Sequence, residues 1–259
     1  MNSSNKDCAI IVPSCDAYSD AWPPFFTFLF KYWPDCPFPV YLISETKTPP
    51  DKRVIPYLLG KDLGWANNMI KILNEIPQKY FIYSLEDVYL QSKVDTSRIA
   101  RYMDLMKKEG ISCIRLTAQP GPNHPYEKDK SLGIIAQDAK YRVSTMCSIW
   151  DKQAFLRLLV PGENAWQMEL LGTKRAADMK ETFLSVYDHN PAMDTLRGTA
   201  IKKGKWQYDY LEFARKEGVT IDTSKRGAQT KKRYMTVRLQ NAPIIKIFYR
   251  TARRLKLCK

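Results

Sequence analysis

The sequence predicts an α/β protein whose mostly parallel sheet is flanked by helices. Apolar runs of strand length alternate with segments whose apolar residues recur at helical spacing. This order is typical of βαβ units, whose strands run parallel. The 259 residues, 44% of them hydrophobic, are enough for one large domain or two small ones.

Three strands and two helices are predicted in the first 90 residues. The strands are Cys8–Pro13, Phe38–Ser44 and Tyr80–Leu85, which are rich in the apolar and aromatic residues of buried strands. The helices are Trp22–Trp33, which two early prolines can open, and Gly64–Ile76. Between them, the polar stretch from Glu45 to Lys52 predicts a surface loop.

The rest of the chain continues the alternation less regularly. Asp95–Glu109 predicts a helix that stops at Gly110, and Ile111–Thr117 a strand. Ala118–Gln137 is rich in Pro, Gly and charge, and predicts a long loop. The later predicted elements are a strand at Tyr141–Ile149, a helix at Asp151–Leu159, a short helix capped by Asn164, a strand at Thr182–Asp188, a basic turn at Lys202–Trp206 and a helix that ends at Gly218.

Positive charge is concentrated at the end of the chain. The segment from Lys225 to Lys259 holds twelve Lys and Arg and no Asp or Glu, so the first 224 residues carry only 14 − 12 = +2 of the net charge. A nearly neutral body argues against a nucleic-acid surface that covers the protein. We therefore predict one domain over residues 1–224 and a basic extension over 225–259.

Cysteine and histidine usage excludes two classes of site. The six cysteines have no CxxC spacing and no secretory signal precedes them, which favours reduced thiols in a cytoplasmic protein. The two histidines, His124 and His189, are far apart and argue against a zinc site. No apolar run approaches the length of a membrane span.

Two adjacent acids, Glu86 and Asp87, follow the strand that begins at Tyr80. Ligands of open α/β sheets gather outside the carboxyl ends of the strands. A pair of carboxylates there suits Mg²⁺ or Mn²⁺, which in turn can hold a diphosphate. The alternative is a strand that ends in a solvated acidic turn.

Four short stretches, taken in order, resemble a family. They are Cys15-Asp-Ala-Tyr-Ser-Asp-Ala-Trp22, Gly64-Trp-Ala-Asn-Asn68, Leu85-Glu-Asp-Val-Tyr89 and Asn164-Ala-Trp-Gln-Met-Glu169. With the strand order, they resemble GT-A-type glycosyltransferases that use nucleotide sugars, and more narrowly bacterial enzymes of capsule and lipopolysaccharide O-antigen synthesis. The resemblance implies a Rossmann-like GT-A fold and transfer of a sugar, of the hexosyltransferase type, from a donor such as a UDP-sugar to a glycan.

The resemblance also implies where the donor and the metal bind. In these enzymes a DxD-like motif holds the metal, Mn²⁺ or Mg²⁺, on the donor diphosphate. The present Leu-Glu-Asp-Val is a variant, in which Asp87 is the expected ligand and Glu86 a second. The implied donor-binding residues are Ser14, Asp16, Ser19, Trp65, Asn68, Glu86, Lys203 and Lys205. For Asp16, the alternative is a residue that only caps the following turn, and for the two lysines a solvated charged turn.

Catalysis requires a general base if the transfer inverts configuration. Inverting members of the fold place an acid early in a helix on the acceptor side, which maps to Glu169, with Asp178 in reserve. Trp166 is expected to stack on an acceptor sugar or else to pack in the core. For Glu169 the alternative is an acid on the surface of the helix.

The basic tail predicts attachment to a membrane surface. Pro243 can open a helix with an apolar face of Ile244, Ile245, Phe248, Ala252 and Leu255, and with Lys and Arg on the remainder. That pattern is typical of a helix in the membrane interface, where each basic residue contributes about 1 kcal/mol on an anionic leaflet. It predicts a cytoplasmic protein at the inner face of the plasma membrane, which would meet a lipid-linked acceptor there. The alternative is an ordinary last helix docked on the body.

Two other functions stay open. A nucleic-acid-binding protein could use the basic tail on phosphates, although the chain has no RNP-type motif, zinc finger or helix-turn-helix pattern, so no nucleic acid is expected. A sugar nucleotidyltransferase would carry a Gly-rich loop with Lys or Arg after the first strand. Pro13–Trp22 contains none of these residues.

Overall fold

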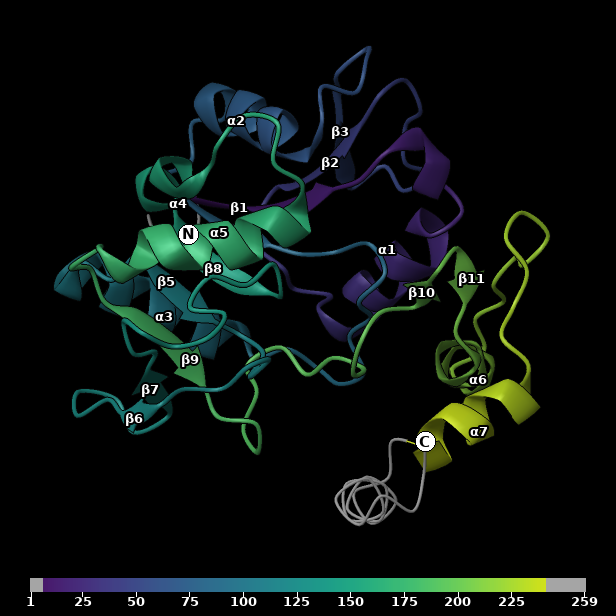
Figure 1. Cartoon of the computed structure of the whole chain (residues 1–259). Helices are drawn as coiled ribbons and strands as arrows, with labels where there is room; N and C mark the ends of the chain where they lie inside the picture. Colours follow the sequence, from purple (N-terminus) through teal and green to yellow (C-terminus); the bar gives the residue numbers. More distant parts are fainter. Residues whose placement is uncertain (1–6, 241–259) are drawn as a thin grey trace, which may run out of the picture. The chain divides into compact units, whose positions relative to one another are not determined.

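The computed structural model describes residues 7–240, so the membrane helix predicted after Pro243 lies outside the described residues. The chain divides into two compact units, Met1–Arg197 and Gly198–Lys259. The division falls after Arg197, whereas the sequence predicts a boundary after residue 224. Figure 1 labels the helices and strands of both units.

Unit 1 is built on one nine-stranded sheet in the order β3-β2-β1-β4-β8-β5-β9-β7-β6. Its strands are β1 (Cys8–Pro13), β2 (Val40–Ser44), β3 (Val54–Leu58), β4 (Tyr80–Tyr83), β5 (Cys113–Arg115), β6 (His124–Pro125), β7 (Leu132–Ile134), β8 (Ser148–Asp151) and β9 (Phe183–Val186). Only β8 and β7 run against the others, since β8 is antiparallel to β4 and β5, and β7 to β9 and β6. The predicted mostly parallel sheet is therefore confirmed.

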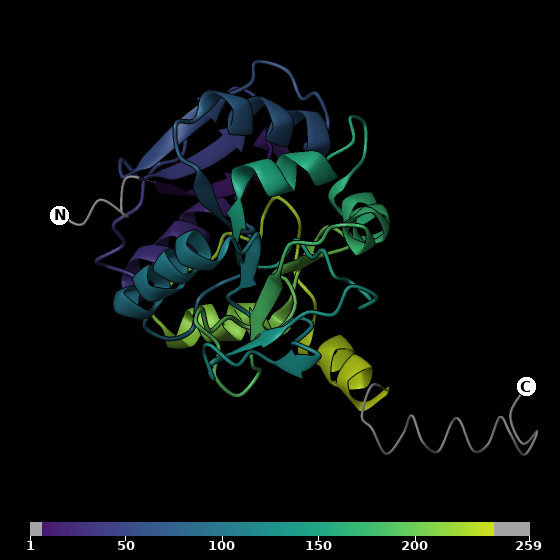
Figure 2. The same cartoon turned by 90° about the vertical axis from the view of Figure 1, so that its left-hand side faces the viewer.

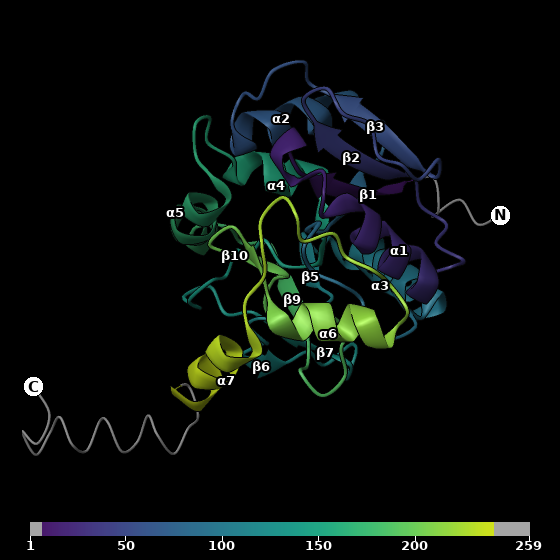
Figure 3. The ribbon, with the colours of Figure 1, turned by 90° about the vertical axis from the view of Figure 1, so that its right-hand side faces the viewer.

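Helices cover both faces of this sheet. They are α1 (Trp22–Tyr32), α2 (Trp65–Glu75), α3 (Thr96–Glu109), α4 (Lys152–Leu158) and α5 (Ala165–Ala177). The helices α2, α4 and α5 lie together on one side and share a core cluster with β1, β4 and β8. Figure 2 and Figure 3 show α1 and α3 on the opposite side of the strands. The strands β1 and β4 are fully buried between these layers, which explains their continuous apolar sequences.

Side chains at the helix ends explain why several boundaries could be predicted. Asp95 caps α3 by accepting from Arg98 N, and Gly110 ends it in the left-handed conformation at φ 65°. Asp151 caps α4 in the same way. Asn164 begins α5 with a capping box, in which its side chain and that of Gln167 each bond the other's backbone.

Three features of unit 1 differ from the prediction. The edge strand β3 was not predicted, because only Val54 is buried and Pro56 interrupts it, as edge strands allow. The long loop of residues 118–137 contains the short hairpin β6–β7. The strand predicted from Tyr141 is restricted to β8, since the backbone at Tyr141, Arg142 and Thr145 bonds the side chains of Arg115 and Glu169 instead of a neighbouring strand.

Two buried arginines hold the chain between β5 and β8. Arg115, at the end of β5, donates to the carbonyls of Pro120, Tyr141 and Arg142. Arg142 donates to the carbonyls of Ile135 (2.6 Å), Ala176 (3.1 Å) and Glu181 (3.0 Å). Burial lowers the pKa of Arg115 to about 10, although the charge of Glu169 opposes this shift.

Unit 2 contains a small hairpin and two helices. The elements are β10 (Ile201–Lys202), β11 (Lys205–Trp206), α6 (Tyr208–Lys216) and α7 (Lys231–Gln240). The predicted basic turn is the hairpin β10–β11, and the helix predicted before Gly218 is α6. Over residues 7–240, no helix is both long and apolar enough to span a membrane.

Candidate functional site

The candidate site lies where β1 and β4 end side by side. These strands are parallel neighbours, with Ile11 opposite Tyr83. Ser14 and Glu86 each follow three residues later, so both lie at the carboxyl edge of the sheet, where ligands of α/β folds gather.

A chain of hydrogen bonds connects this edge to α1. Ser14 Oγ donates to Glu86 Oε1 at 3.0 Å, and accepts from the buried indole Nε1 of Trp22 at 2.8 Å. Only 8% of Glu86 and 9% of Asp87 is exposed. Buried carboxylates are rare unless something compensates their charge, so the two acids differ from the solvated turn considered above.

Glu169 is held by the segment that precedes β8. Its Oε1 accepts hydrogen bonds from Thr145 N at 2.7 Å, Thr145 Oγ1 at 2.9 Å and Ser144 Oγ at 3.2 Å. Glu169 occupies the second turn of α5, as predicted from the cap at Asn164. A carboxylate with three donors on one oxygen has a fixed orientation, unlike an acid on a free helix surface.

Tyr83 lies within electrostatic range of all three carboxylates. Burial raises the pKa of its hydroxyl, the hydrogen bond from Trp65 Nε1 (3.2 Å) opposes this shift, and the charges of Glu86, Glu169 and Asp87 raise the pKa further. The structure thus brings together, around the end of β4, the predicted metal ligands and the predicted base.

A pocket of about 220 Å³ opens beside Glu86. Four predicted donor-binding residues line it: Ser14, Trp65, Asn68 and Glu86. Its other lining residues are Pro13, Cys15, Tyr18, Ile43 and Asp62. The volume is below the roughly 300–1,000 Å³ of typical ligand sites, so it suits a group the size of a nucleobase rather than a whole nucleotide sugar.

Asp62 is a lining residue that the sequence interpretation missed. Its Oδ1 accepts from Gly64 N and from Asn68 Nδ2, both at 2.8 Å, and Asn68 Oδ1 accepts from Leu63 N at 3.1 Å. These bonds fix the turn before α2 and place a carboxylate at the pocket. An Asp two residues before Gly64 is a turn signal, and that signal could have marked this position.

Two predicted donor-binding residues point to a neighbouring loop instead. Asp16 accepts from Thr46 Oγ1 at 2.6 Å and from Lys47 N at 3.0 Å, and Ser19 Oγ accepts from Lys47 Nζ at 3.1 Å. Neither residue lines the pocket. Desolvation opposes the shift, but the hydrogen bonds from Thr46 and Lys47 lower the pKa of Asp16 to about 2. Both side chains fix the loop that carries Ser14.

Trp166 and Asp178 lie at opposite ends of α5. Trp166 is 65% exposed, which excludes a core role, and it precedes Glu169 by three residues, on the same side of the helix. Asp178 is the C-cap residue, nine positions after Glu169, or about 13 Å along a helix. The structure therefore does not bring the reserve base to Glu169.

The predicted donor lysines belong to unit 2. Lys203 lies in the turn between β10 and β11, and Lys205 begins β11. Both line a basic pocket that is formed entirely by unit 2.

The carboxylates of Glu86 and Asp87 fit a divalent cation whose remaining coordination positions are filled by water and by a bound substrate. Within residues 7–240, no group of three or more His, Cys, Asp or Glu side chains could hold a metal. Two adjacent carboxylates fit Mg²⁺ or Mn²⁺, since such ions keep several waters and share substrate phosphates rather than fill an all-protein cage.

Comparison with solved structures identifies the fold. No protein-family model matches the chain, and neither does any curated protein sequence. Residues 1–349 of TarS from S. aureus superpose with a TM-score of 0.50 and 14% identity over 81% of the present chain. A mannosyltransferase from Pyrobaculum calidifontis, in complex with GDP-Man and Mn²⁺, does so with a TM-score of 0.50 and 10% identity over 76%.

The present chain spans only about three fifths of these proteins, 63% and 58% of their lengths. At such identities the likeness concerns the fold alone. The sheet, its helical layers and these neighbours together establish that the chain has the α/β fold of GT-A glycosyltransferases.

Proposed function

We propose that this protein is a glycosyltransferase that moves a sugar from a nucleotide-sugar donor, specifically a UDP-sugar, to a glycan acceptor. One observation carries the proposal: Glu86 and Asp87 are buried just after β4, whose Tyr83 pairs with Ser148 of β8, and the segment directly before Ser148 holds Glu169. The neighbouring mannosyltransferase, which was solved with GDP-Man and Mn²⁺, supports this class of reaction.

The pocket beside Glu86 is the proposed site of the donor base and ribose. Trp65 offers an aromatic wall, and Ser14 and Asn68 offer polar groups. Asp62 adds a carboxylate that can accept hydrogen bonds from ribose hydroxyls or base N–H groups. In this proposal Asp16 and Ser19 do not contact the donor. Their hydrogen bonds to the loop after β2 fix the loop after β1, which carries the lining residue Ser14.

Asp87 and Glu86 are the proposed ligands of Mn²⁺ or Mg²⁺. The bound ion would hold the donor diphosphate and neutralise the charge that develops when the nucleoside diphosphate leaves. Ser14 keeps Glu86 oriented for this purpose through its 3.0 Å hydrogen bond. The predicted role of Lys203 and Lys205, to neutralise the donor diphosphate, stays a prediction.

Glu169 is the proposed general base. Among the described residues, its three hydrogen bonds all reach Oε1, so Oε2 can accept the proton of the acceptor hydroxyl while the hydroxyl oxygen attacks the donor sugar. The bond between the sugar and the diphosphate breaks, and the nucleoside diphosphate leaves with the electron pair. Trp166 is exposed on the same helix and is proposed to stack on the acceptor sugar.

The acceptor is proposed to be a lipid-linked glycan of bacterial surface polysaccharide, such as capsule or lipopolysaccharide O-antigen. The basic C-terminal segment supports this assignment, since it would hold the enzyme at an anionic inner membrane surface. On the same basis we propose that the protein is cytoplasmic and peripheral to the plasma membrane. The group that it transfers is proposed to be a hexosyl group.

The test is a donor screen with the full chain. The protein is incubated with a panel of UDP- and GDP-sugars and Mn²⁺, and nucleotide release and thermal shift are measured. We expect release with one donor class, and its loss in EDTA and in Asp87→Ala. The control is Asp104→Ala, an exposed acid on α3. If no nucleotide sugar shifts the melting temperature, or Asp87→Ala keeps full activity, the proposed site is wrong.

A further inference from the structure

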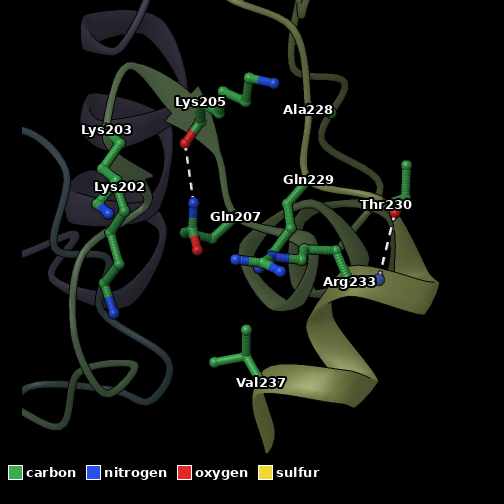
Figure 4. Close-up of a pocket in the computed structure, with 9 residues that line it drawn as sticks. All are labelled: Lys202, Lys203, Lys205, Gln207, Ala228, Gln229, Thr230, Arg233 and Val237. Carbon is green, nitrogen blue, oxygen red and sulfur yellow. Dashed lines mark hydrogen bonds between the residues drawn. The ribbon is translucent and has the colours of Figure 1, made fainter.

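Unit 2 contains a pocket of about 450 Å³ that is lined by four cationic side chains and no acid. The cations are Lys202, Lys203, Lys205 and Arg233, and the remaining lining residues are Gln207, Ala228, Gln229, Thr230 and Val237. Figure 4 shows Arg233 extending from α7 into the pocket, toward the side formed by Lys202 and Lys203. No salt bridge between residues of the described chain neutralises any of the four cations.

The walls of this pocket are tied together by the backbone. Trp206 N donates to Gly227 O at 3.1 Å, and Gln229 N donates to Trp206 O at 2.8 Å, so β11 pairs with the segment before α7. Trp206 itself is fully buried. On the other side, the rings of Tyr208 and Tyr234, 5.3 Å apart, pack α7 against α6. The cations therefore project from a preformed frame rather than from independent surface segments.

The hairpin turn holds one of these lysines in an unusual conformation. Lys203 and Gly204 have φ angles of 50° and 71°, as both central residues of a type I′ turn require. Asn, Asp or Gly is the usual first residue of such a turn. A lysine is less favourable there, because at positive φ its Cβ lies close to the following carbonyl oxygen. Backbone strain of this kind is concentrated at ligand sites, and here it places a cation between Lys202 and Lys205.

Four like charges around one cavity repel one another until an anion enters it. Lysine ammonium and arginine guanidinium groups bind phosphate oxygens with strong, charge-assisted hydrogen bonds. Gln207, Gln229 and Thr230 add polar groups, and Ala228 and Val237 give one wall an apolar character. The volume exceeds that of a bare phosphate ion. The lining thus matches a phosphate ester, with its anionic group on the cations and its organic part against the apolar wall.

We propose that unit 2 binds the phosphate group of a phosphate ester in this basic pocket, through its lysine and arginine side chains and without a metal ion. The inference stands on unit 2 alone and does not depend on the proposed transferase activity. The phosphate is borne either by a soluble small molecule or by a lipid headgroup, since both present the same oxygens to the four cations.

The experiment compares two adjacent residues of α7 in the full chain. Arg233→Gln removes a cation that lines the pocket, whereas Lys232→Gln removes one that does not, from the same basic segment. Both variants lose one charge, so any difference between them measures the pocket and not the general basicity of the tail. Thermal melting confirms that both are folded, and Arg233→Lys tests whether charge alone restores binding.

Two arms, both in EDTA, distinguish the source of the phosphate. In one, titration calorimetry measures binding of pyrophosphate and of glycerol 3-phosphate, a phosphate ester without a nucleoside; in the other, cosedimentation measures binding to phosphatidylglycerol vesicles. In at least one arm we expect Arg233→Gln to weaken binding at least about tenfold, the scale of one lost charged hydrogen bond, and Lys232→Gln to weaken it less than about twofold.

The arm in which this difference is seen identifies the soluble or the lipid source. Asp87→Ala is expected to bind like the parent, so failure of the transferase proposal leaves this result unchanged. Equal losses in Arg233→Gln and Lys232→Gln, binding that requires Asp87, or no binding in either arm would overturn the proposal.

Discussion

Ser14 Oγ donates a hydrogen bond to Glu86 Oε1 across 3.0 Å, although 72 residues separate them in sequence. The parallel pairing of β1 with β4 brings them to the same edge of the sheet. The loop after the first strand thus orients one of the two carboxylates that follow the central strand. A mutation in that loop should therefore affect the candidate metal site.

Ser14→Ala should lower both stability and donor affinity. It removes the donor to Glu86 and leaves the buried Nε1 of Trp22 without its acceptor, which costs roughly 1–3 kcal/mol. Chemical denaturation and the KM for the donor measure the two effects. Thr27→Ala is the control, since Thr27 is exposed on α1 and its hydroxyl donates only to the carbonyl of Pro23 in the same helix among the described residues. Equal behaviour of the two variants would contradict the role given to Ser14.

Glu169→Gln should lower turnover by at least about a hundredfold, the usual scale for loss of a general base. Donor binding should persist, because Glu169 bonds Ser144 and Thr145 rather than the pocket residues. Single-turnover kinetics and donor titration separate the two. Asp178→Asn, at the other end of α5, should change turnover only a few-fold. The reverse ranking would transfer the base role to Asp178.

Arg142→Met should destabilise unit 1 by at least about 3 kcal/mol. Arg142 is 2% exposed, and its guanidinium donates hydrogen bonds to three backbone carbonyls, each of which would lose a charged donor. Urea denaturation measures the change. Arg157→Met is the matched control: its ion pair with Glu181 is exposed and should contribute at most about 1 kcal/mol. Similar losses in the two variants would mean that the buried bonds are not what holds this segment.

The ionised carboxylate of Asp16 should make the stability of the folded protein depend on pH below about pH 4. Because its pKa of about 2 in the folded protein lies below the ordinary 3.8, its contribution is present above pH 4 and is lost as pH falls through 2. The melting-temperature difference between the parent and Asp16→Asn should therefore be constant above pH 4 and shrink toward pH 2. Asp104→Asn provides the baseline. A difference that grows on acidification would contradict this sign.

The C-terminal segment should direct the protein to anionic vesicles. In flotation with anionic and with neutral vesicles, the full chain should bind only the anionic ones, and a chain that ends at Gln240 should bind them much more weakly. The removed segment carries six Lys and Arg, and each contributes about 1 kcal/mol near an anionic leaflet. Identical flotation of the two chains, or binding that ignores lipid charge, would disprove membrane attachment through this segment.

The elements that could be predicted are those whose sequence alone satisfies the local backbone. The strands β1 and β4 are buried on both faces, and α3 and α5 carry their own caps at Asp95 and Asn164. Each of these signals lies within a few residues of the element that it defines. By contrast, β3 is an edge strand with one buried residue, so its sequence has no apolar pattern of a strand. Its backbone hydrogen bonds to β2 define it instead.

The residues of the candidate site also fall into two groups, those with a local sequence signal and those placed by bonds to distant parts of the chain. Glu86 and Asp87 could be located because they follow a strand, and Glu169 because it follows a cap. For Asp62 the sequence offers only a turn signal before Gly64, since its place at the pocket depends on the hydrogen bond from Asn68 of the next helix. The segment from Tyr141 to Cys147 reads as strand, but the buried guanidinium of Arg115 binds its carbonyls from a distant part of the chain. Such long-range bonds leave no local periodicity.

The position of β8 between β4 and β5 has a consequence for synthesis of the chain on the ribosome. β4 is complete at residue 83, yet the strand that covers its second edge begins only at Ser148. Until then a nascent chain exposes a row of unpaired backbone groups beside the acids of the candidate site, and such edges recruit other chains. Pairing across this separation is slow because a long loop must close first. Fragments that end before Ser148 should therefore aggregate, whereas chains that include β8 can bury this edge and leave the ribosome folded.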